Sequence, residues 1–159
     1  RILDLWLACH TQQDIAQTLG IPQQTIADRL AVLPEQFQGN QSGKITFQDW
    51  IEDKTIPLYN VWKQQDKSAG VSHFGNSEPR WLENLLYLYT EPFDIVADPC
   101  AGGGSTIDVC KRRGRRYYVS DRKPIVARED EIRAWDLTDG LPKIPRWQDV
   151  RLVYLDPPY

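Results

Sequence analysis

A glycine-rich loop at residues 98–106 lies between an apolar segment at 93–97 and a segment with helical spacing at 105–113. A second apolar segment follows at 116–120. Strand, glycine turn, helix and strand in this order form the βαβ pattern of a parallel sheet. We therefore predict an α/β fold built on a doubly wound parallel sheet.

The segments on either side extend this pattern. Leucines and a tyrosine recur at helical spacing and predict a helix over 79–89. Residues 128–135 predict a helix that leads into a short third strand at 133–135. The apolar run at 151–155 predicts a final strand. The predicted sheet thus has four strands and is truncated after the fourth.

The N-terminal residues 1–36 carry a helix-turn-helix pattern. Thr11, with an acid three residues on, is placed to cap a first helix, and Gly20 can take the positive φ that ends that helix. The small Ala16 lets a second helix at 23–33 pack closely against the first. We predict a small all-α helix-turn-helix domain in front of the sheet.

The second of these helices is the candidate for reading DNA. Gln can pair with adenine through two hydrogen bonds, and Arg can do the same with guanine. The alternative is a helical hairpin that does not contact DNA, because the segment has few basic residues to anchor phosphates. The candidate DNA-binding residues are Gln23, Gln24, Thr25 and Arg29, and Asp28 is predicted to be exposed beside them.

These patterns divide the chain into three segments. Residues 1–36 form the helix-turn-helix, 37–66 are a polar and turn-rich linker or irregular region, and 67–159 carry the sheet. The chain starts at Arg1, contains no methionine and stops inside what looks like a motif. We expect it to be an internal part of a longer protein.

Composition limits the classes of partner and site. The net charge is −3, so any nucleic-acid contact depends on local basic patches. The basic run at 111–116 suits the negative end of a helix, and we interpret it as a solvated face. Three cysteines without CxxC spacing and two histidines predict no metal site. The odd cysteine count favours a reducing cytoplasm, and no apolar run has the length of a membrane span.

Acidic residues follow three successive predicted strands. Asp121 ends the second strand, 23 residues after Asp98, where a doubly wound fold places a ribose-binding carboxylate. Asp136 follows the third strand. Because parallel strands end at one edge of a sheet, the three acids are expected to point into one crevice. The loop lacks a following Gly-Lys-Ser/Thr, which argues against a nucleotide triphosphatase.

The tetrapeptide Asp156, Pro157, Pro158 and Tyr159 follows the last apolar strand directly. Its two prolines stiffen the backbone and project an acid and an aromatic ring from the edge where doubly wound sheets bind ligands. We predict that these four residues are catalytic. The 49 residues between Thr106 and Asp156 leave no room for a separate recognition domain, so target recognition is expected after the tetrapeptide or in the N-terminal segment.

Residues 76–159 resemble the S-adenosylmethionine-dependent DNA amino-methyltransferases, whose donor loop and catalytic motif match 98–106 and 156–159. The resemblance implies a Rossmann-like methyltransferase sheet, with Glu78 standing where the family has Lys. It places Asp98 near the methionine part of the donor, Asp121 on the ribose hydroxyls and Asp136 at the adenine amine. The implied cofactor-binding residues are Asp98, Pro99, Cys100, Ala101, Gly102, Gly104, Ser105, Thr106, Asp121 and Asp136.

This resemblance implies transfer of a methyl group from S-adenosylmethionine to an exocyclic amine of a base in double-stranded DNA, without a metal ion. The Asp at the first motif position favours adenine N6 over cytosine N4. We expect a cytoplasmic protein of bacterial, archaeal or phage origin, not associated with a membrane, and expect this segment alone to be inactive. Residues 11–30 resemble the helix-turn-helix of ParB-type partition proteins. Two alternatives stay open, a ParB-like DNA-binding module with a non-catalytic methyltransferase remnant and a ribosomal-RNA amino-methyltransferase.

Overall fold

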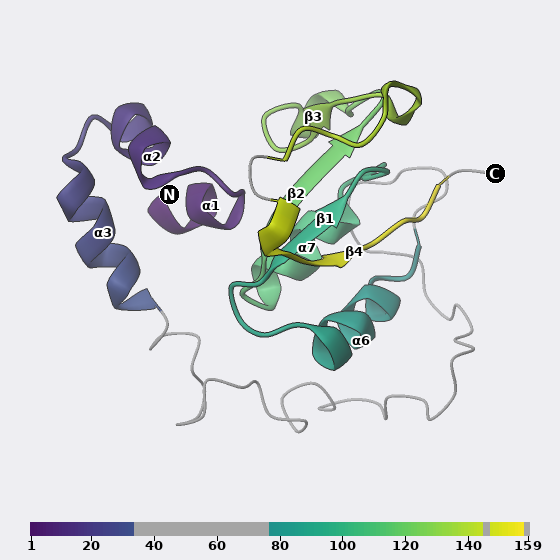
Figure 1. Cartoon of the computed structure of the whole chain (residues 1–159), viewed down its shortest axis with the longest axis horizontal. Coiled ribbons are helices and arrows are strands. Elements are labelled where there is room, and N and C mark those ends of the chain that lie inside the picture. Colours follow the sequence, from purple (N-terminus) through teal and green to yellow (C-terminus); the bar gives the residue numbers. More distant parts are fainter. Residues whose placement is uncertain (34–76, 145–146, 158–159) are drawn as a thin grey trace.

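A four-stranded parallel sheet forms the centre of the computed structural model, which describes residues 1–33, 77–144 and 147–157 (Figure 1). The strand order is β3-β2-β1-β4. Neighbouring strands pair in parallel throughout, with Ile95 opposite Arg116 and Val96 opposite Leu152. This arrangement confirms the predicted α/β class with a parallel, Rossmann-like sheet. The strands are β1 (Ile95–Asp98), β2 (Arg116–Asp121), β3 (Arg133–Ala134) and β4 (Val150–Val153).

Two helices of the C-terminal part pack on one face of the sheet. They are α6 (Pro79–Tyr89), whose bounds match the prediction, and α7 (Ser105–Arg112), which ends one residue earlier than predicted. Helix α6 begins with a proline at its first position, where the missing N–H costs no hydrogen bond. Helix α7 contacts β2 and α6, so the helices lie side by side over the strands.

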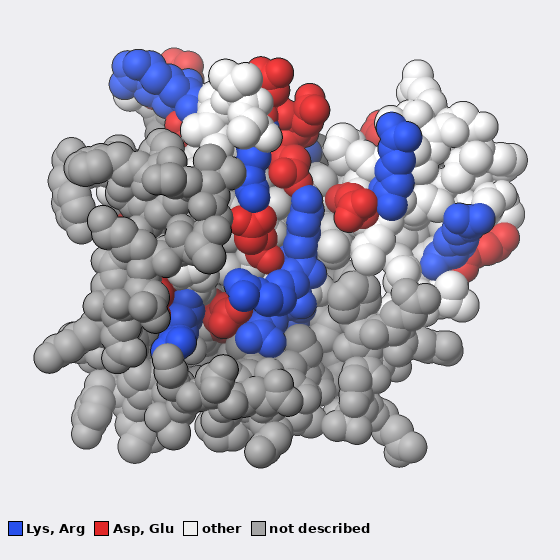
Figure 2. Space-filling model, turned by 180° about the vertical axis from the view of Figure 1, so that it is seen from behind, with Lys and Arg blue, Asp and Glu red and all other residues white. Residues whose placement is uncertain are grey.

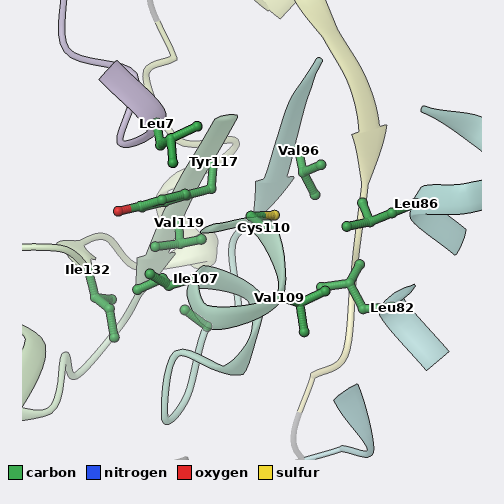
Figure 3. Packing of buried hydrophobic residues seen from close by; sticks show 11 residues of the cluster. Leu7, Leu82, Leu86, Val96, Ile107, Val109, Cys110, Tyr117, Val119 and Ile132 are labelled. Carbon is green, nitrogen blue, oxygen red and sulfur yellow. The ribbon is translucent and has the colours of Figure 1, made fainter. Parts of the chain in front are cut away.

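Alternate residues of the strands point to the two faces of the sheet, as a pleated strand requires. Val96, Tyr117 and Val119 face the helices, and Figure 3 shows them with Ile107, Cys110 and other apolar side chains of α6 and α7. Ala97 and Tyr118 face the opposite side, where Ile144, Trp147 and Val150 cover them. In the described part of the chain the second face is therefore covered by the segment that leads into β4.

The N-terminal residues form three helices, α1 (Ile2–Leu7), α2 (Gln12–Leu19) and α3 (Gln23–Ala31). The predicted capping box at the start of α2 is present in both directions, because the Thr11 side chain accepts from the Asp14 N–H and the Asp14 carboxylate accepts from the Thr11 N–H. Gly20 ends α2 with φ of 66°. The second helix stops at residue 31, two residues before the predicted end.

Helix α1 belongs to two apolar clusters at once. Leu7 is buried among the side chains under the sheet, whereas Trp6 packs against the cluster of Ile15, Ile26 and Leu30 between α2 and α3. The Arg116 guanidinium lies 3.9 Å from the centre of a Trp6 ring and donates to the Trp6 carbonyl at 3.2 Å. The helical segment at 1–33 is thus attached to β2 through α1.

One predicted element is wrong. Residues 128–135 do not form an α-helix before the third strand. A short 3₁₀ turn, Val126–Arg128, is followed by a bend and then by β3. Ile132 is fully buried and the Arg128 side chain reaches back to the glycine-rich loop, so tertiary contacts outweigh local helical preference. Two further 3₁₀ turns are Leu137–Asp139 and Trp147–Asp149.

The predicted linker at 37–66, the end of the predicted first domain at residue 36, and Pro158 and Tyr159 of the predicted catalytic tetrapeptide lie outside the described residues. Within 1–33, 77–144 and 147–157, the helices are all too short or too polar to pass through a lipid bilayer.

Candidate functional site

Four acids lie at or just beyond the carboxyl ends of the four strands. Asp98 is the last residue of β1 and Asp121 the last of β2. Asp136 comes two residues after β3, and Asp156 three residues after β4. In an open parallel sheet this edge is where ligands bind. The parallel pairing therefore brings residues far apart in the sequence to one edge.

Asp98 is the buried member of this group, with only 2% of its surface exposed. Its carboxylate accepts from the Cys100 N–H at 2.9 Å and from the Thr106 hydroxyl at 2.5 Å. Burial raises the pKa of Asp98 to about 6, against the effect of these hydrogen bonds, and the nearby carboxylates of Asp156 and Asp121 raise it further. Asp121 and Asp156 thus lie near enough to Asp98 for their charges to act on it.

The glycine-rich loop connects Asp98 to α7 and touches the end of β2. Gly102, with φ of 51°, donates its N–H to a carboxylate oxygen of Asp121 at 2.9 Å. Gly104, with φ of 79°, is the residue before the first turn of α7. The Ala101 N–H donates to the Ser120 carbonyl at 3.0 Å. Of the predicted loop residues, Pro99, Ala101, Gly104 and Thr106 are buried, and Cys100, Gly102 and Ser105 are half-buried.

Arg128 holds the glycine-rich loop through hydrogen bonds, a role that the sequence patterns did not indicate. Its guanidinium donates to the Gly104 carbonyl at 2.9 Å and to the Asp108 carboxylate of α7 at 2.6 Å. A methyl group placed on Gly104 would lie 2.9 Å from the Arg128 side chain, which is too close for an undisturbed contact. The loop conformation therefore requires glycine here for space as well as for φ.

Asp136 has a different set of partners from the other acids. Its carboxylate accepts from the N–H and the hydroxyl of Thr138, both at 2.9 Å, and caps the 3₁₀ turn that follows. Arg122 lies 3.4 Å from it. The backbone hydrogen bond from Thr138 is the first cause that lowers the pKa of Asp136. Asp136 sits at the same edge, since Trp135 donates its N–H to the Asp121 carbonyl at 2.9 Å.

Asp156 and Pro157 are exposed just beyond β4. The hydroxyl of Ser77, which lies two residues before α6, donates to Oδ2 of Asp156. Tyr154 lies near Ser77 and Asp156, and burial, followed by the carboxylates of Asp156 and Asp98, raises the pKa of Tyr154 to about 12. Sequence patterns gave no sign of Ser77 or Tyr154, because the contact joins positions 79 apart in the chain.

The basic run at 111–116 is only partly solvated, contrary to its interpretation as a solvated face. Arg115 is 2% exposed and donates to the Thr90 hydroxyl and carbonyl, each at 2.9 Å. Arg112 and Arg113 lie 3.2 and 3.4 Å from the carboxylate of Glu83. On the face of the molecule that Figure 2 shows, Lys or Arg and Asp or Glu side chains lie close together. These cations therefore stabilise the fold and are not arranged as an open phosphate-binding surface.

The predicted recognition helix presents its polar residues outward. Gln23, Gln24 and Arg29 are exposed, and Thr25 is half-buried. The Gln24 amide donates to the Asp28 carboxylate at 2.8 Å along one side of α3. Ile26 and Leu30 point the other way, into the cluster under α2. Helix α3 thus has one exposed polar side and one buried apolar side, and its role in reading DNA stays a prediction.

Comparison with known proteins now adds to this geometry. A family model described as DNA methylase, of the N6/N4 methyltransferase type, matches residues 14–128. That range covers more than half of the chain. This chain belongs to the DNA methylase family.

A curated relative supports the assignment of this DNA methylase. The Type II methyltransferase M.XycI of Xanthomonas campestris pv. cyanopsidis is 31% identical to it over 65 residues, which is 41% of this chain and 22% of the relative. The chain thus matches less than a quarter of that relative's length. No solved structure matches the chain. Within the described residues, no group of three or more His, Cys, Asp or Glu side chains is arranged to hold a metal ion.

Proposed function

We propose that this DNA methylase carries the donor-binding and catalytic residues that transfer a methyl group from S-adenosylmethionine to an exocyclic amine of a DNA base, with adenine N6 as the acceptor. The observation that carries the proposal is the meeting of Asp98, Asp121 and Asp156 at one edge of the sheet. Asp156 there begins the Asp-Pro-Pro-Tyr tetrapeptide.

The residues at this edge fit the donor. S-adenosylmethionine carries a positive sulfonium and a positive ammonium group, and the carboxylates of Asp98 and Asp121 form a negative region that suits both. Gly102 and Gly104 bring the backbone close to a ligand without side chains in the way. Asp98 would lie near the methionine part, Asp121 at the ribose and Asp136 at the adenine ring. When bound, the donor supplies an electrophilic methyl group.

The acceptor amine is held by the tetrapeptide. An exocyclic amine is a weak nucleophile because its lone pair is delocalised into the ring. The Asp156 carboxylate and the Pro157 carbonyl each accept one N–H, which localises that lone pair on nitrogen. The target base must leave the duplex to reach them, and Tyr159 offers a ring for it to stack on.

The cysteines of the site are poorly suited to covalent catalysis. Burial, followed by the carboxylates of Asp98 and Asp121, raises the pKa of the Cys100 thiol, and burial raises that of Cys110. A nucleophilic cysteine needs the opposite shift, because the thiolate is the reactive form. Direct transfer to an amine, which needs no enzyme nucleophile, is therefore favoured over methylation of a ring carbon.

The helix-turn-helix supplies duplex binding in this proposal. The exposed side chains of Gln23, Gln24 and Arg29 give α3 the donors and acceptors that read base edges in a major groove. Helix α1 joins this unit to the sheet through Leu7 and Trp6. A duplex held by α3 is thereby tied to the domain that carries the acids.

The test is methyl transfer by the full-length protein from radiolabelled donor, with duplex DNA and ribosomal RNA offered separately. Label on DNA, recovered as N6-methyladenine after digestion, is the expected result. Asp156→Ala should abolish transfer and leave the donor affinity measured by calorimetry within about twofold, since the variant loses a group of the acceptor site. Asp130→Ala, which removes an exposed acid away from the strand ends, is the matched control.

Three outcomes contradict the proposal. Transfer retained by Asp156→Ala removes the tetrapeptide from the chemistry. Label on cytosine C5 shows that another mechanism operates. Label on RNA but not on DNA assigns a different substrate. Recovery of N4-methylcytosine changes only the acceptor base.

A further inference from the structure

We infer that Ser77 and Tyr154 are positioning residues that hold the Asp156 carboxylate in the orientation in which it accepts the target amine. The inference rests on the proposed function and deepens it. Its first observation is the hydrogen bond from the Ser77 hydroxyl to Oδ2 of Asp156. Its second is the Tyr154 side chain, which lies near both of these residues.

Pairing with β1 fixes the backbone of Tyr154, which lies two residues before Asp156. The Tyr154 N–H donates to the Ala97 carbonyl at 2.8 Å, so the pairing of β4 with β1 continues past the end of β4. Leu152 and Tyr154 are half-buried and pack on the cluster under the sheet, whereas Val153 and Leu155 are 44% and 60% exposed. The alternation turns the Tyr154 side chain towards the layer of α6 and α7.

Ser77 reaches the same place from the helix layer. It lies two residues before Pro79, the first residue of α6, and Glu78 between them is 4% exposed. The burial of Glu78 and the start of the helix restrict where the Ser77 backbone can go. Helix α6 contacts β4, so the Ser77 hydroxyl and the Asp156 carboxylate are brought together by packing on both sides.

These contacts restrict a group that would otherwise be free to rotate. Asp156 is exposed, and no Lys or Arg among the described residues forms an ion pair with it. An exposed carboxylate populates several rotamers, and catalysis needs the one that faces the amine. Ser77 and Tyr154 are neutral, so they orient the carboxylate without cancelling its charge. A carboxylate offers about four lone-pair positions, which leaves acceptor capacity for the amine.

The experiment uses the full-length protein and four variants, Ser77→Ala, Ser77→Thr, Tyr154→Phe and the double variant Ser77→Ala with Tyr154→Phe. Loss of either hydroxyl should lower kcat about 10- to 100-fold, as expected when a reacting group is misplaced. KM for the donor should stay within about twofold, because neither side chain is assigned to donor binding. Ser77→Thr keeps the hydroxyl and should restore most of the lost kcat. The double variant should lose less than the product of the single losses, since both residues act on one carboxylate.

A second readout needs neither donor nor turnover. The phenol of Tyr154, whose pKa is raised to about 12, can be titrated by NMR of the donor-free protein with ¹³C-labelled tyrosine. Asp156→Asn should lower this pKa, because a neighbouring negative charge and its hydrogen bond are lost. A purely structural role of Tyr154, without an interaction with Asp156, predicts no shift.

The outcomes separate this inference from the proposed function. Wild-type kcat in both Ser77→Ala and Tyr154→Phe, with Asp156→Ala inactive, overturns the positioning role and leaves the proposed function standing. A rise in donor KM without a fall in kcat also overturns it. Absence of transfer by the wild-type protein overturns both. If Ser77→Ala does not fold, Tyr154→Phe and the titration of Tyr154 in Asp156→Asn decide the question.

Discussion

The hydroxyl of Thr106 donates a hydrogen bond of 2.5 Å to the buried carboxylate of Asp98. Asp98 ends β1 and Thr106 lies in the first turn of α7, so this one bond joins the two ends of the glycine-rich loop. The Cys100 N–H holds the other oxygen of the carboxylate at 2.9 Å. The loop is therefore built around an acid that is costly to ionise in its buried position.

The first prediction concerns how the free energy of unfolding depends on pH, because Asp98 is costly to ionise. Because its pKa is raised from an ordinary value of 3.8 to about 6, folded Asp98 binds more protons than unfolded Asp98 between about pH 4 and pH 6. The free energy of unfolding should therefore fall as pH rises through this window, by about 3 kcal/mol at most, and should stay lower above it. Asp98→Asn should remove this dependence, because an amide can accept from the Cys100 N–H and donate to the Thr106 hydroxyl.

Urea denaturation of the wild type, Asp98→Asn and Asp139→Asn at pH 4, 6 and 8 measures the effect. Asp139 is exposed and serves as the control for loss of one carboxylate. The difference between Asp98→Asn and the wild type should grow in favour of the variant from pH 4 to pH 8. An equal difference at all three pH values would show that Asp98 ionises normally.

The second prediction concerns the space around Gly104. Gly104→Ala should lower the free energy of unfolding by about 2–4 kcal/mol, from the strain of a positive φ and from the clash with Arg128. Gly20→Ala is the matched control, because φ is 66° and ψ 31° there, close to the 79° and 27° of Gly104, and an added methyl group would have no neighbour within 4 Å. The control should lose only the φ strain, about 1–2 kcal/mol. Equal losses in thermal denaturation would show that Arg128 moves away without cost.

The third prediction tests the donor contact proposed for Asp121. Asp121→Ala should weaken binding of S-adenosylmethionine by about 1.5–3 kcal/mol, the range for a hydrogen bond to a charged group. Part of the loss would come from the loop, because Asp121 also accepts from the Gly102 N–H. Calorimetry on Asp121→Ala, with Asp130→Ala as control, measures it. An unchanged affinity would remove Asp121 from the donor site.

The fourth prediction concerns α3. Arg29→Ala should weaken binding to target duplex by about 1–3 kcal/mol if Arg29 contacts a base. Arg1 and Arg29 are the two basic residues of the first 33, so Arg1→Ala is a control of equal charge outside α3. Fluorescence anisotropy with labelled duplex at low salt gives the affinities. If Arg29→Ala and Arg1→Ala behave alike, the helix-turn-helix contributes charge but no base contact.

Local patterns predicted the elements whose causes lie within a few residues. The capping box of Thr11 and Asp14 marks the start of α2, and the positive φ of Gly20 marks its end. The apolar spacing of 79–89 predicts α6. Alternation of strand and helix was enough to predict parallel pairing, which in turn sends Asp98 and Asp121 to one edge. These features depend on capping, backbone sterics and hydrophobic periodicity, which act over one or two turns of chain.

Tertiary packing decided the features whose partners are distant in the chain. Residues 128–135 did not become a helix, because Arg128 is held by the glycine-rich loop. Arg115 is buried inside a basic run, since the Thr90 hydroxyl and carbonyl satisfy its guanidinium. Both outcomes depend on hydrogen bonds to partners more than 20 residues away, and no local pattern contains that information.

The sequence by itself therefore determined the class of fold, the order of the main elements and the acids that follow the strands. The tertiary structure alone decided that α1 joins α2 and α3 to the sheet, and that Ser77 meets Asp156 across 79 positions. The physical reason is the distance along the chain over which each kind of interaction acts. Capping and periodicity act between neighbours in the chain, whereas a buried contact between distant residues forms only when the whole core packs.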